Sequence, residues 1–224
     1  MALRVDFHTH TRYSKDSLTS IPGFVKAARR AGLDRVVVSD HNTIAGALEA
    51  HRLAPDLVIV GEEILTTQGE ILAAYVREEI PAGLEPAEVI RRLRQQGAFI
   101  SVSHPFDLYR SGYWEAPDLE QILSQVDAIE IFNSRCMLQS QNDLARDFAE
   151  RHDIPGTAGS DAHTAREIGR AVMILPEFSD ASSLRRSVQQ VEIEALLSSP
   201  AIHFSSRCAV MVKGLQEKLR RTTG

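Results

Sequence analysis

The sequence predicts a single α/β barrel that carries a metal site at the carboxyl ends of its strands. Two observations support this fold class. Short apolar runs alternate with helical patterns, which is typical of parallel βαβ units. In addition, strings of His, Asp and Glu begin where five of the apolar runs stop. Residues 1–224 are long enough for one such domain with a sizeable core, and they show no linker and no internal repeat.

Eight apolar runs have the length and composition of strands. They are Leu3–Phe7, Arg35–Ser39, Leu57–Gly61, Ile71–Val76, Ala98–Ser101, Ala128–Phe132, Gly156–Ala158 and Ala171–Leu175. Six segments show the apolar spacing of helices, namely Pro22–Ala31, Thr43–Leu53, Pro86–Gln96, Leu119–Gln125, Gln139–Arg151 and Ala181–Val191. The fourth run follows the third too closely for a crossover helix. We therefore expect one hairpin and a somewhat distorted barrel of fewer than eight regular units.

Local signals agree with these helix boundaries. Ser20 is a plausible N-cap for the first helix, and Pro86 lies in the first turn of the third. Gly32 and Gly97 stand where the first and third helices should end.

The last segment, about residues 205–222, has a different character. Cys208, Met211, Leu215 and Leu219 fall at helical spacing, and Arg and Lys side chains occupy the other faces. We expect a C-terminal helix that packs on the outside of the barrel with a solvated basic face. Contact with a partner or with RNA is the alternative.

The composition excludes several classes of protein. The apolar fraction of 43%, the charged fraction of 25% and the net charge of −5 are typical of a globular protein and argue against a nucleic-acid coat or a membrane-surface protein. We see no signal peptide and no apolar run long enough for a membrane span. Cys136 and Cys208 have no motif spacing, so we expect reduced thiols in a cytoplasmic protein.

The strings of metal-binding residues share one kind of position. His8 and His10 end the first apolar run, and Asp161 and His163 follow the seventh. Residues i and i+2 of an extended chain project to the same face, so each pair can converge on one point. Because the carboxyl ends of barrel strands open on one face, we expect a polynuclear metal site there. Three further strings are expected to join it, Ser39-Asp40-His41-Asn42, Gly61-Glu62-Glu63-Ile64 and Ser103-His104-Pro105.

In their order along the chain, these motifs resemble those of the PHP family, the polymerase and histidinol phosphatase superfamily of metal-dependent phosphoesterases. The similarity extends from residue 3 to about residue 175. It implies a distorted (β/α)7 barrel with a trinuclear zinc, manganese or iron site. The resemblance assigns His8, His10, Glu63 and Asp161 to one metal, the bridging Glu63 and His104 to a second, and Asp16, His41 and His163 to a third.

Two positions depart from the pattern of some family members. Asp16 stands where some members have histidine, and an oxygen ligand favours manganese or iron over zinc. Asn133 follows the strand-like run 128–132, where some members supply a histidine. The second metal then has fewer protein ligands, or it is completed by Asn133 or water. We therefore expect two or three divalent ions.

Such a site suits hydrolysis of a phosphate ester. Metal ions lower the pKa of a bound water toward neutrality, and the resulting metal-bound hydroxide is the nucleophile. They also offset charge that develops on the phosphoryl oxygens. The expected catalytic residues are Glu63, Asp161 and His163. Asp6 and Asp40 adjoin ligand motifs and are expected to orient histidines; the alternative is that they bind backbone at strand ends.

Arginine suits the oxygens of a phosphate. Arg135 and Asn133 follow one strand-like run, and Arg12 lies in the loop after His10, so these three are the expected substrate-binding residues. The substrate is expected to be a small phosphorylated molecule, a nucleotide or a short nucleic-acid end. Two other functions remain open: an amidohydrolase-like C–N hydrolase, and a non-catalytic metal-binding module.

Overall fold

The structure is a computed structural model, and it describes residues 2–110 and 112–223. The strands are β1 (Ala2–Thr9), β2 (Arg35–Val38), β3 (Val58–Leu65), β4 (Glu70–Ala74), β5 (Phe99–Val102), β6 (Ala128–Asn133), β7 (Gly156–Gly159), β8 (Ala171–Pro176) and β9 (Glu192–Ala195). The helices are α1 (Ile21–Arg30), α2 (Ala45–Leu53), α3 (Pro86–Gln96), α4 (Ala116–Ile122), α5 (Gln139–Arg151), α6 (Ala181–Ser187) and α7 (Ile202–Thr223). Short 3₁₀ turns follow α4 and α6, at Leu123–Gln125 and Val188–Gln190.

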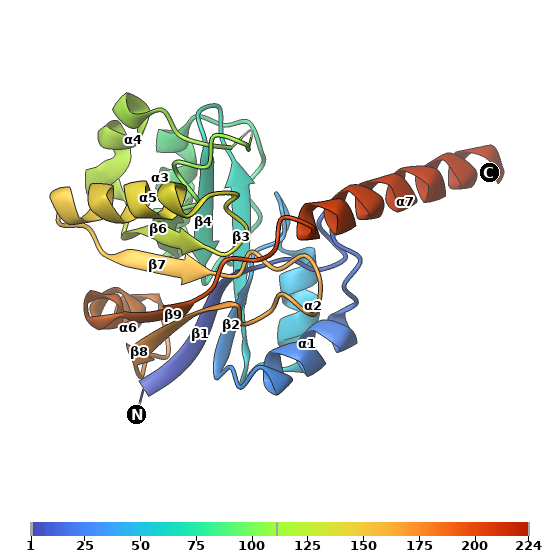
Figure 1. The fold of residues 1–224 in the computed structure, drawn as a ribbon, viewed down its shortest axis with the longest axis horizontal. Coiled ribbons are helices and arrows are strands. Elements are labelled where there is room, and N and C mark those ends of the chain that lie inside the picture. The colour runs from blue at the N-terminus through green and yellow to red at the C-terminus, as the bar shows by residue number, and fades with distance from the viewer. Residues whose placement is uncertain (1, 111, 224) are drawn as a thin grey trace.

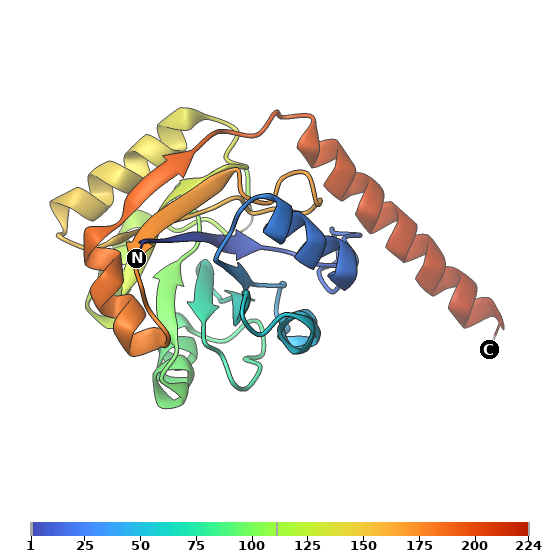
Figure 2. The same ribbon diagram turned by 90° about the horizontal axis from the view of Figure 1, so that it is seen from below.

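The strands form one curved sheet that is nearly closed into a barrel, with helices around it (Figures 1 and 2). Its order is β7-β6-β5-β4-β3-β2-β1-β8-β9. β1, β2 and β3 are parallel, as are β5, β6 and β7, whereas β4 is antiparallel to both its neighbours. The predicted hairpin is therefore the β3–β4 pair, and the predicted distorted α/β barrel is confirmed.

The sheet closes where β1 approaches the end of β7. The Asp161 N–H donates to the His8 carbonyl at 2.7 Å, and the His10 N–H donates to the Ala162 carbonyl at 2.8 Å. These two hydrogen bonds join β1 to the segment that follows β7. They also place the two ligand pairs that the sequence predicts next to each other.

Helix ends follow the signals in the sequence. The Ser20 hydroxyl accepts a hydrogen bond from the Gly23 N–H at the start of α1. Gly97 ends α3 in the left-handed conformation, with φ of 76°, and its N–H bonds back to the last turn of the helix. The strand that the sequence does not predict is β9, a short edge strand antiparallel to β8 with alternating burial.

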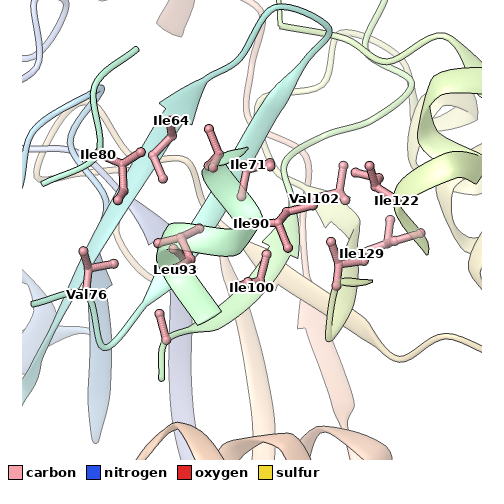
Figure 3. Packing of buried hydrophobic residues seen from close by; sticks show 14 of the residues in the cluster. Ile64, Ile71, Val76, Ile80, Ile90, Leu93, Ile100, Val102, Ile122 and Ile129 are labelled. Carbon is pink, nitrogen blue, oxygen red and sulfur yellow. The ribbon is translucent and has the colours of Figure 1, made fainter. Parts of the chain in front are cut away.

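Apolar side chains pack on both surfaces of the sheet. One cluster lies between α3 and the strands β3, β4, β5 and β6, and Figure 3 shows Leu93 and Ile90 of the helix against Ile71, Ile100 and Ile129 of the sheet. A second cluster fills the barrel interior, where Phe7 meets the Phe99 ring edge-to-face at 5.4 Å. Burial of these side chains fixes the strands whose carboxyl ends carry the site.

The C-terminal helix extends farther than the segment predicted from the sequence. We expected it to pack on the outside of the barrel. In the structure, Ser206, Ala209 and Lys213 contact the mouth of the barrel, and the rest of α7 extends away from it (Figures 1 and 2). Leu215 and Leu219 are consequently 60% and 58% exposed. Across the described residues, every helix is too short or too polar to cross a membrane.

Candidate metal centre

Four donor atoms converge at the point where β1, β3 and the end of β7 meet. The His8 Nε2 lies 3.1 Å from the His10 Nε2 and 3.2 Å from the Glu63 Oε2. The Asp161 Oδ1 lies 3.1 Å from the His10 Nε2 and 3.7 Å from the His8 Nε2. A tetrahedral ion with bonds of about 2.0–2.1 Å holds its donor atoms roughly 3.3 Å apart. These four side chains therefore have the spacing of one metal coordination shell.

Unpaired oxygens support this interpretation. The Glu63 Oε2 and the Asp161 Oδ1 are buried, and neither has a hydrogen-bond partner among the described residues. A buried carboxylate oxygen without a partner is costly, and coordination of a cation removes that cost. The side chains present therefore fit a divalent ion.

A second group of donors lies on the other side of Glu63. The His104 Nε2 is 3.1 Å from the Glu63 Oε1 and 3.4 Å from the Glu70 Oε2. His41, Glu63 and Glu70 also have ligand atoms within 4.8 Å of one another. Glu63 thus faces both groups, one with each carboxylate oxygen, as a bridging ligand would.

The third group lies nearer to the solvent. The Asp16 Oδ2 is 3.0 Å from the His163 Nε2 and 3.6 Å from the His41 Nε2. His10, His41 and His163 likewise have ligand atoms within 4.8 Å of one another. Asp16, which stands where some family members have histidine, therefore lies close to His41 and His163. These are the two histidines that the resemblance assigns, together with Asp16, to the third metal.

Hydrogen bonds fix which nitrogen three of the histidines turn toward the centre. The His8 Nδ1 pairs with the Glu130 carboxylate at 3.0 Å, and the His10 Nδ1 pairs with the Ser14 hydroxyl at 3.0 Å. The His163 Nδ1 donates to the backbone carbonyl of Asp161 at 2.8 Å. In each case the Nε2 is left free to bind a metal, which is the usual way that proteins orient such ligands.

The two aspartates expected to orient histidines have different partners. Asp40 accepts hydrogen bonds from the Thr11 N–H and from the Ser14 hydroxyl, at 2.7 Å each, so it acts on His10 through Ser14. Asp6 accepts hydrogen bonds from the Ser160 hydroxyl at 2.6 Å and from the Gly169 N–H at 2.8 Å. Asp6 therefore holds the chain that carries Asp161 and contacts no histidine ring.

The electrostatics of the site are those of ionised carboxylates packed against imidazoles. Burial alone would raise the pKa of Glu63, but the adjacent His8 and His41 keep it well below its ordinary value. Burial opposes protonation of His8, yet Glu63, Glu130 and Asp161 raise its pKa well above the ordinary value. The centre accordingly favours cations.

The predicted substrate-binding residues have unequal access to the cavity above the metal centre. This cavity has a volume of about 1600 Å³, and both Arg12 and Arg135 line it. Arg135 is 3% exposed and donates to the Glu167 carboxylate at 2.8 Å, so its charge is already compensated. Asn133 is buried and donates to the Glu130 and Asp161 carboxylates at 3.1 and 3.2 Å.

Sequence reasoning missed Arg110, which is the cation closest to the predicted ligands. Its guanidinium donates to the Asp161 Oδ2, lies 3.2 Å from the Asp107 Oδ2, and approaches the His104 Nε2 to 3.5 Å. Its side chain is 19% exposed and lines the cavity. Arg110 comes from a loop without strand or helix, so no periodic signal in the sequence indicated its position. Glu70 and Glu130 were missed because they belong to no short ligand motif.

The comparisons with known proteins identify the family. A family model described as the PHP domain matches residues 6–98, and a second, described as PHP-associated, matches residues 139–190. The uncharacterized protein MJ0417 of Methanocaldococcus jannaschii is 34% identical over 180 residues, which cover 79% of this chain and 72% of that protein. The chain belongs to the PHP family.

Solved structures share the fold. PsfC from Pseudomonas syringae matches with a TM-score of 0.70 and 18% identity, covering 94% of this chain and 98% of that one. A two-domain protein from Bacteroides vulgatus containing a predicted PHP-like metal-dependent phosphoesterase matches with a TM-score of 0.69 and 18% identity, covering 88% of this chain and 65% of that one. The fold is thus that of PHP-like phosphoesterases.

Two further neighbours bear on the alternatives. The lesion-specific endonuclease PfuEndoQ from Pyrococcus furiosus has a TM-score of 0.60 at 18% identity, and covers 86% of this chain and 58% of that one. An amidohydrolase from Chromobacterium violaceum has a TM-score of 0.58 at 13% identity, and covers 91% of this chain and 96% of that one. At these identities the likeness concerns the barrel alone.

Proposed function

We propose that the protein is a metal-dependent phosphoesterase that hydrolyses a phosphate ester at the mouth of the barrel. The observation that carries this proposal is the convergence of His8, His10, Glu63 and Asp161 at donor spacings of 3.1–3.7 Å, with two carboxylate oxygens left unpaired. Family membership and the phosphoesterase fold support the same reaction class.

Two or three manganese, zinc or iron ions would be held by three sets of side chains. The sets are His8, His10, Glu63 and Asp161; then Glu63, His104 and Glu70; then Asp16, His41 and His163. Ions bound there activate a water molecule and stabilise negative charge on phosphoryl oxygens.

The protein groups around the ions have separate proposed roles in metal binding, proton transfer and phosphate binding. Glu63, which faces His8 with one carboxylate oxygen and His104 with the other, would be shared by the first two sets. His163 lines the cavity, with its Nδ1 3.4 Å from the Oδ1 of the buried Asp161, and a protonated imidazole at this position can deliver a proton to the leaving oxygen. Arg110 holds a phosphate oxygen beside Asp161, while Asn133 and Glu130 keep Asp161 and His8 in position.

Hydrolysis of two model esters tests the proposal. The chain, loaded in turn with manganese, zinc and iron, is assayed with p-nitrophenyl phosphate and bis-p-nitrophenyl phosphate. We expect one or both to be cleaved, and the preferred ester assigns the enzyme to phosphatases or phosphodiesterases. Glu63→Gln should abolish cleavage. Glu62→Gln is the matched control, because the Glu62 carboxylate lies on the opposite face of β3 and accepts the Ile80 N–H at 3.1 Å.

Three outcomes of these assays would contradict the proposal. If a chain with a filled metal site cleaves neither ester, the phosphoesterase proposal fails and the non-catalytic metal-binding module is favoured. If Glu63→Gln retains full activity, the assignment of the metal centre is wrong. Cleavage of amides in place of esters would favour the amidohydrolase alternative, to which the fold has a distant likeness.

A further inference from the structure

The cavity above the metal centre is larger than a simple phosphate ester requires. Pockets for small ligands have volumes of roughly 300–1,000 Å³, whereas this cavity has about 1600 Å³. Its floor includes Asp16, His41 and His163 of the metal centre. One wall is formed by α7, which contributes Phe204, Arg207 and Met211 among others. The cavity thus extends from the metal centre along the C-terminal helix.

Two anchors hold α7 beside the mouth of the barrel. The Arg135 Nη2 donates to the Ser206 hydroxyl at 2.8 Å, and Arg135 is itself held by Glu167. Seven residues further along the helix, the Lys213 ammonium donates to the Arg12 carbonyl at 2.6 Å and to the Ser14 carbonyl. Ser14 also orients His10, so the second anchor joins α7 to the loop that supports the metal centre.

The charge of α7 is opposite to that of the whole chain. The chain has a net charge of −5. The helix, in contrast, has Arg207, Lys213, Lys218, Arg220 and Arg221 against Glu217 as its one acidic residue. Three cations of other segments, Arg12, Lys15 and Arg110, line the same cavity. Six Arg and Lys residues line the cavity against three acidic residues, Asp16, Glu70 and Asp107, so the lining is net positive and attracts a polyanion.

Aromatic side chains accompany these cations. Tyr13, Tyr109 and Phe204 line the cavity and are 40%, 69% and 73% exposed. Arg12 lies over the Tyr13 ring, with its guanidinium carbon 5.6 Å from the ring centroid, whereas the more exposed Tyr109 and Phe204 bury little apolar surface in the free protein and are available to a ligand. Basic grooves interspersed with aromatic rings bind single-stranded nucleic acid, because cations contact the phosphates and rings stack on unpaired bases.

We propose that α7 and the facing loops, which carry Tyr13 and Tyr109, bind a single-stranded oligonucleotide and direct one of its phosphodiester groups to the metal centre. The proposal rests on the phosphoesterase function proposed above and names its substrate class. The basic character of α7 favours this ligand over a second copy of the helix, because two copies would bring like charges together. DNA and RNA share the chemistry that the cavity recognises.

Binding is measured without catalysis, so that the two proposals are tested separately. Fluorescence anisotropy is recorded in EDTA, with labelled single strands of about ten nucleotides, one of DNA and one of RNA, and with a DNA duplex of the same sequence. We expect the single strands to bind and the duplex to bind at least about tenfold more weakly, since its bases cannot stack on the rings.

Two variants and one control identify the surface. Arg207→Ala should weaken binding about fivefold and lower the magnitude of the slope of log K against log salt by about one. Phe204→Ala should weaken binding by a similar factor with the slope unchanged. Arg186→Ala is the control, because this exposed arginine of α6 lies beside Arg185, which contacts the Ala98 carbonyl just before β5 begins, away from the metal centre.

Each alternative result overturns the inference. The proposal fails if single strands do not bind at low salt, if the duplex binds equally well, or if both variants bind like the control. It also fails if the chain forms a dimer that is dissociated by the substitution Leu215→Glu but not by added oligonucleotide. In that case α7 would bind a second copy of the chain. Hydrolysis of the model esters is independent of these outcomes, so loss of one proposal leaves the other intact.

Discussion

Glu62 and Glu63 are consecutive residues of β3 whose carboxylates lie on opposite faces of the strand. The Glu63 carboxylate approaches His8, His41 and His104, at 3.2, 3.0 and 3.1 Å. The Glu62 carboxylate is equally buried but accepts a hydrogen bond from the Ile80 N–H at 3.1 Å. Strand alternation alone therefore separates the proposed bridging metal ligand from a carboxyl group embedded in the protein.

The first prediction concerns Glu62 and the pH dependence of stability. Burial, with a contribution from Glu79, raises the pKa of Glu62 from 4.5 to about 8. Its contribution to stability is thus fully present below the unfolded pKa and is lost as the pH rises toward 8, by up to about 1.4 kcal/mol per pH unit. Glu62→Gln cannot ionise, so its stability relative to the unchanged protein should increase from pH 5 to pH 8.

Urea unfolding of both proteins across that range measures the difference. Glu120→Gln, on the exposed face of α4, is the control and should show no such trend. A constant difference between Glu62→Gln and the unchanged protein at all pH values would contradict the prediction.

The second prediction concerns removal of the metal. Without a cation, Glu63 and Asp161 each keep a buried carboxylate oxygen without a hydrogen-bond partner, and Glu70 lies close to Glu63, so a bound ion would offset the cost of this negative charge. A ligand present at 100 times its dissociation constant adds about 2.7 kcal/mol to the free energy of unfolding. This corresponds to an increase in Tm of roughly 5–10 °C for a domain of this size. Calorimetry should show that Tm falls by this amount on chelation and recovers when manganese or zinc is added. Glu63→Gln should show a much smaller change, and an equal change in both proteins would count against the site.

The third prediction concerns Glu70 and the number of ions. Glu70 lies 3.4 Å from His104 on the side of the second metal set, and Asn133 donates instead to Glu130 and Asp161. A Cβ on Gly112 would meet the Glu70 Oε2 at 2.2 Å, so this glycine leaves room for the carboxylate. Glu70→Gln should therefore lose one ion per chain as measured by elemental analysis after dialysis. Retention of the full metal content would exclude Glu70 as a ligand.

The fourth prediction concerns Ser14. Its hydroxyl donates to Asp40 at 2.7 Å and accepts from the His10 ring and from the His41 N–H, at 3.0 and 3.1 Å. Ser14→Ala leaves every ligand in place but removes the group that orients His10. Metal affinity should fall about 10- to 100-fold, as measured by competition with a fluorescent chelator. Ser124→Ala, at an exposed site, provides the comparison, and equal affinities would show that Ser14 has no positioning role.

The fifth prediction concerns Arg110. Arg110→Lys keeps the charge but loses the planar fork that contacts Asp161 and Asp107 together. We expect KM for the cleaved ester and the inhibition constant of inorganic phosphate to rise about tenfold, with a smaller change in kcat. Arg146→Ala on the exposed face of α5 should change neither constant. An unchanged phosphate inhibition constant in Arg110→Lys would remove Arg110 from the phosphate site.

The sequence predicts more of the metal centre than of its surroundings, for a physical reason. Ligands such as His8 and His10 lie at strand ends, and the period of the strand fixes both their direction and their common edge. Arg110 lies in a loop whose path depends on tertiary contacts, including the hydrogen bond from the Trp114 indole to the Glu70 carbonyl. Such contacts leave no periodic pattern in a single sequence.

Dependence on long-range contacts also explains why the sequence did not predict the partner of Arg135 or the direction of the C-terminal helix. Arg135 follows a strand as expected, but its partner Glu167 is 32 residues away, and nothing local indicates the pair. The spacing predicts a helix over about residues 205–222, close to the observed α7, whereas the direction of this helix depends on the anchors at Ser206 and Lys213. Periodicity identifies an element, and long-range pairs determine where it lies.

The hydrogen bonds that close the barrel also bring the proposed metal ligands together. His8 and His10 belong to the first strand, whereas Asp161 follows the seventh, and the two segments meet through the hydrogen bond between the Asp161 N–H and the His8 carbonyl. A chain emerging from the ribosome therefore carries three of the four proposed ligands, His8, His10 and Glu63, about a hundred residues before it carries Asp161. Contacts this distant in sequence form slowly, so binding of an ion by all four proposed ligands would require the closed barrel.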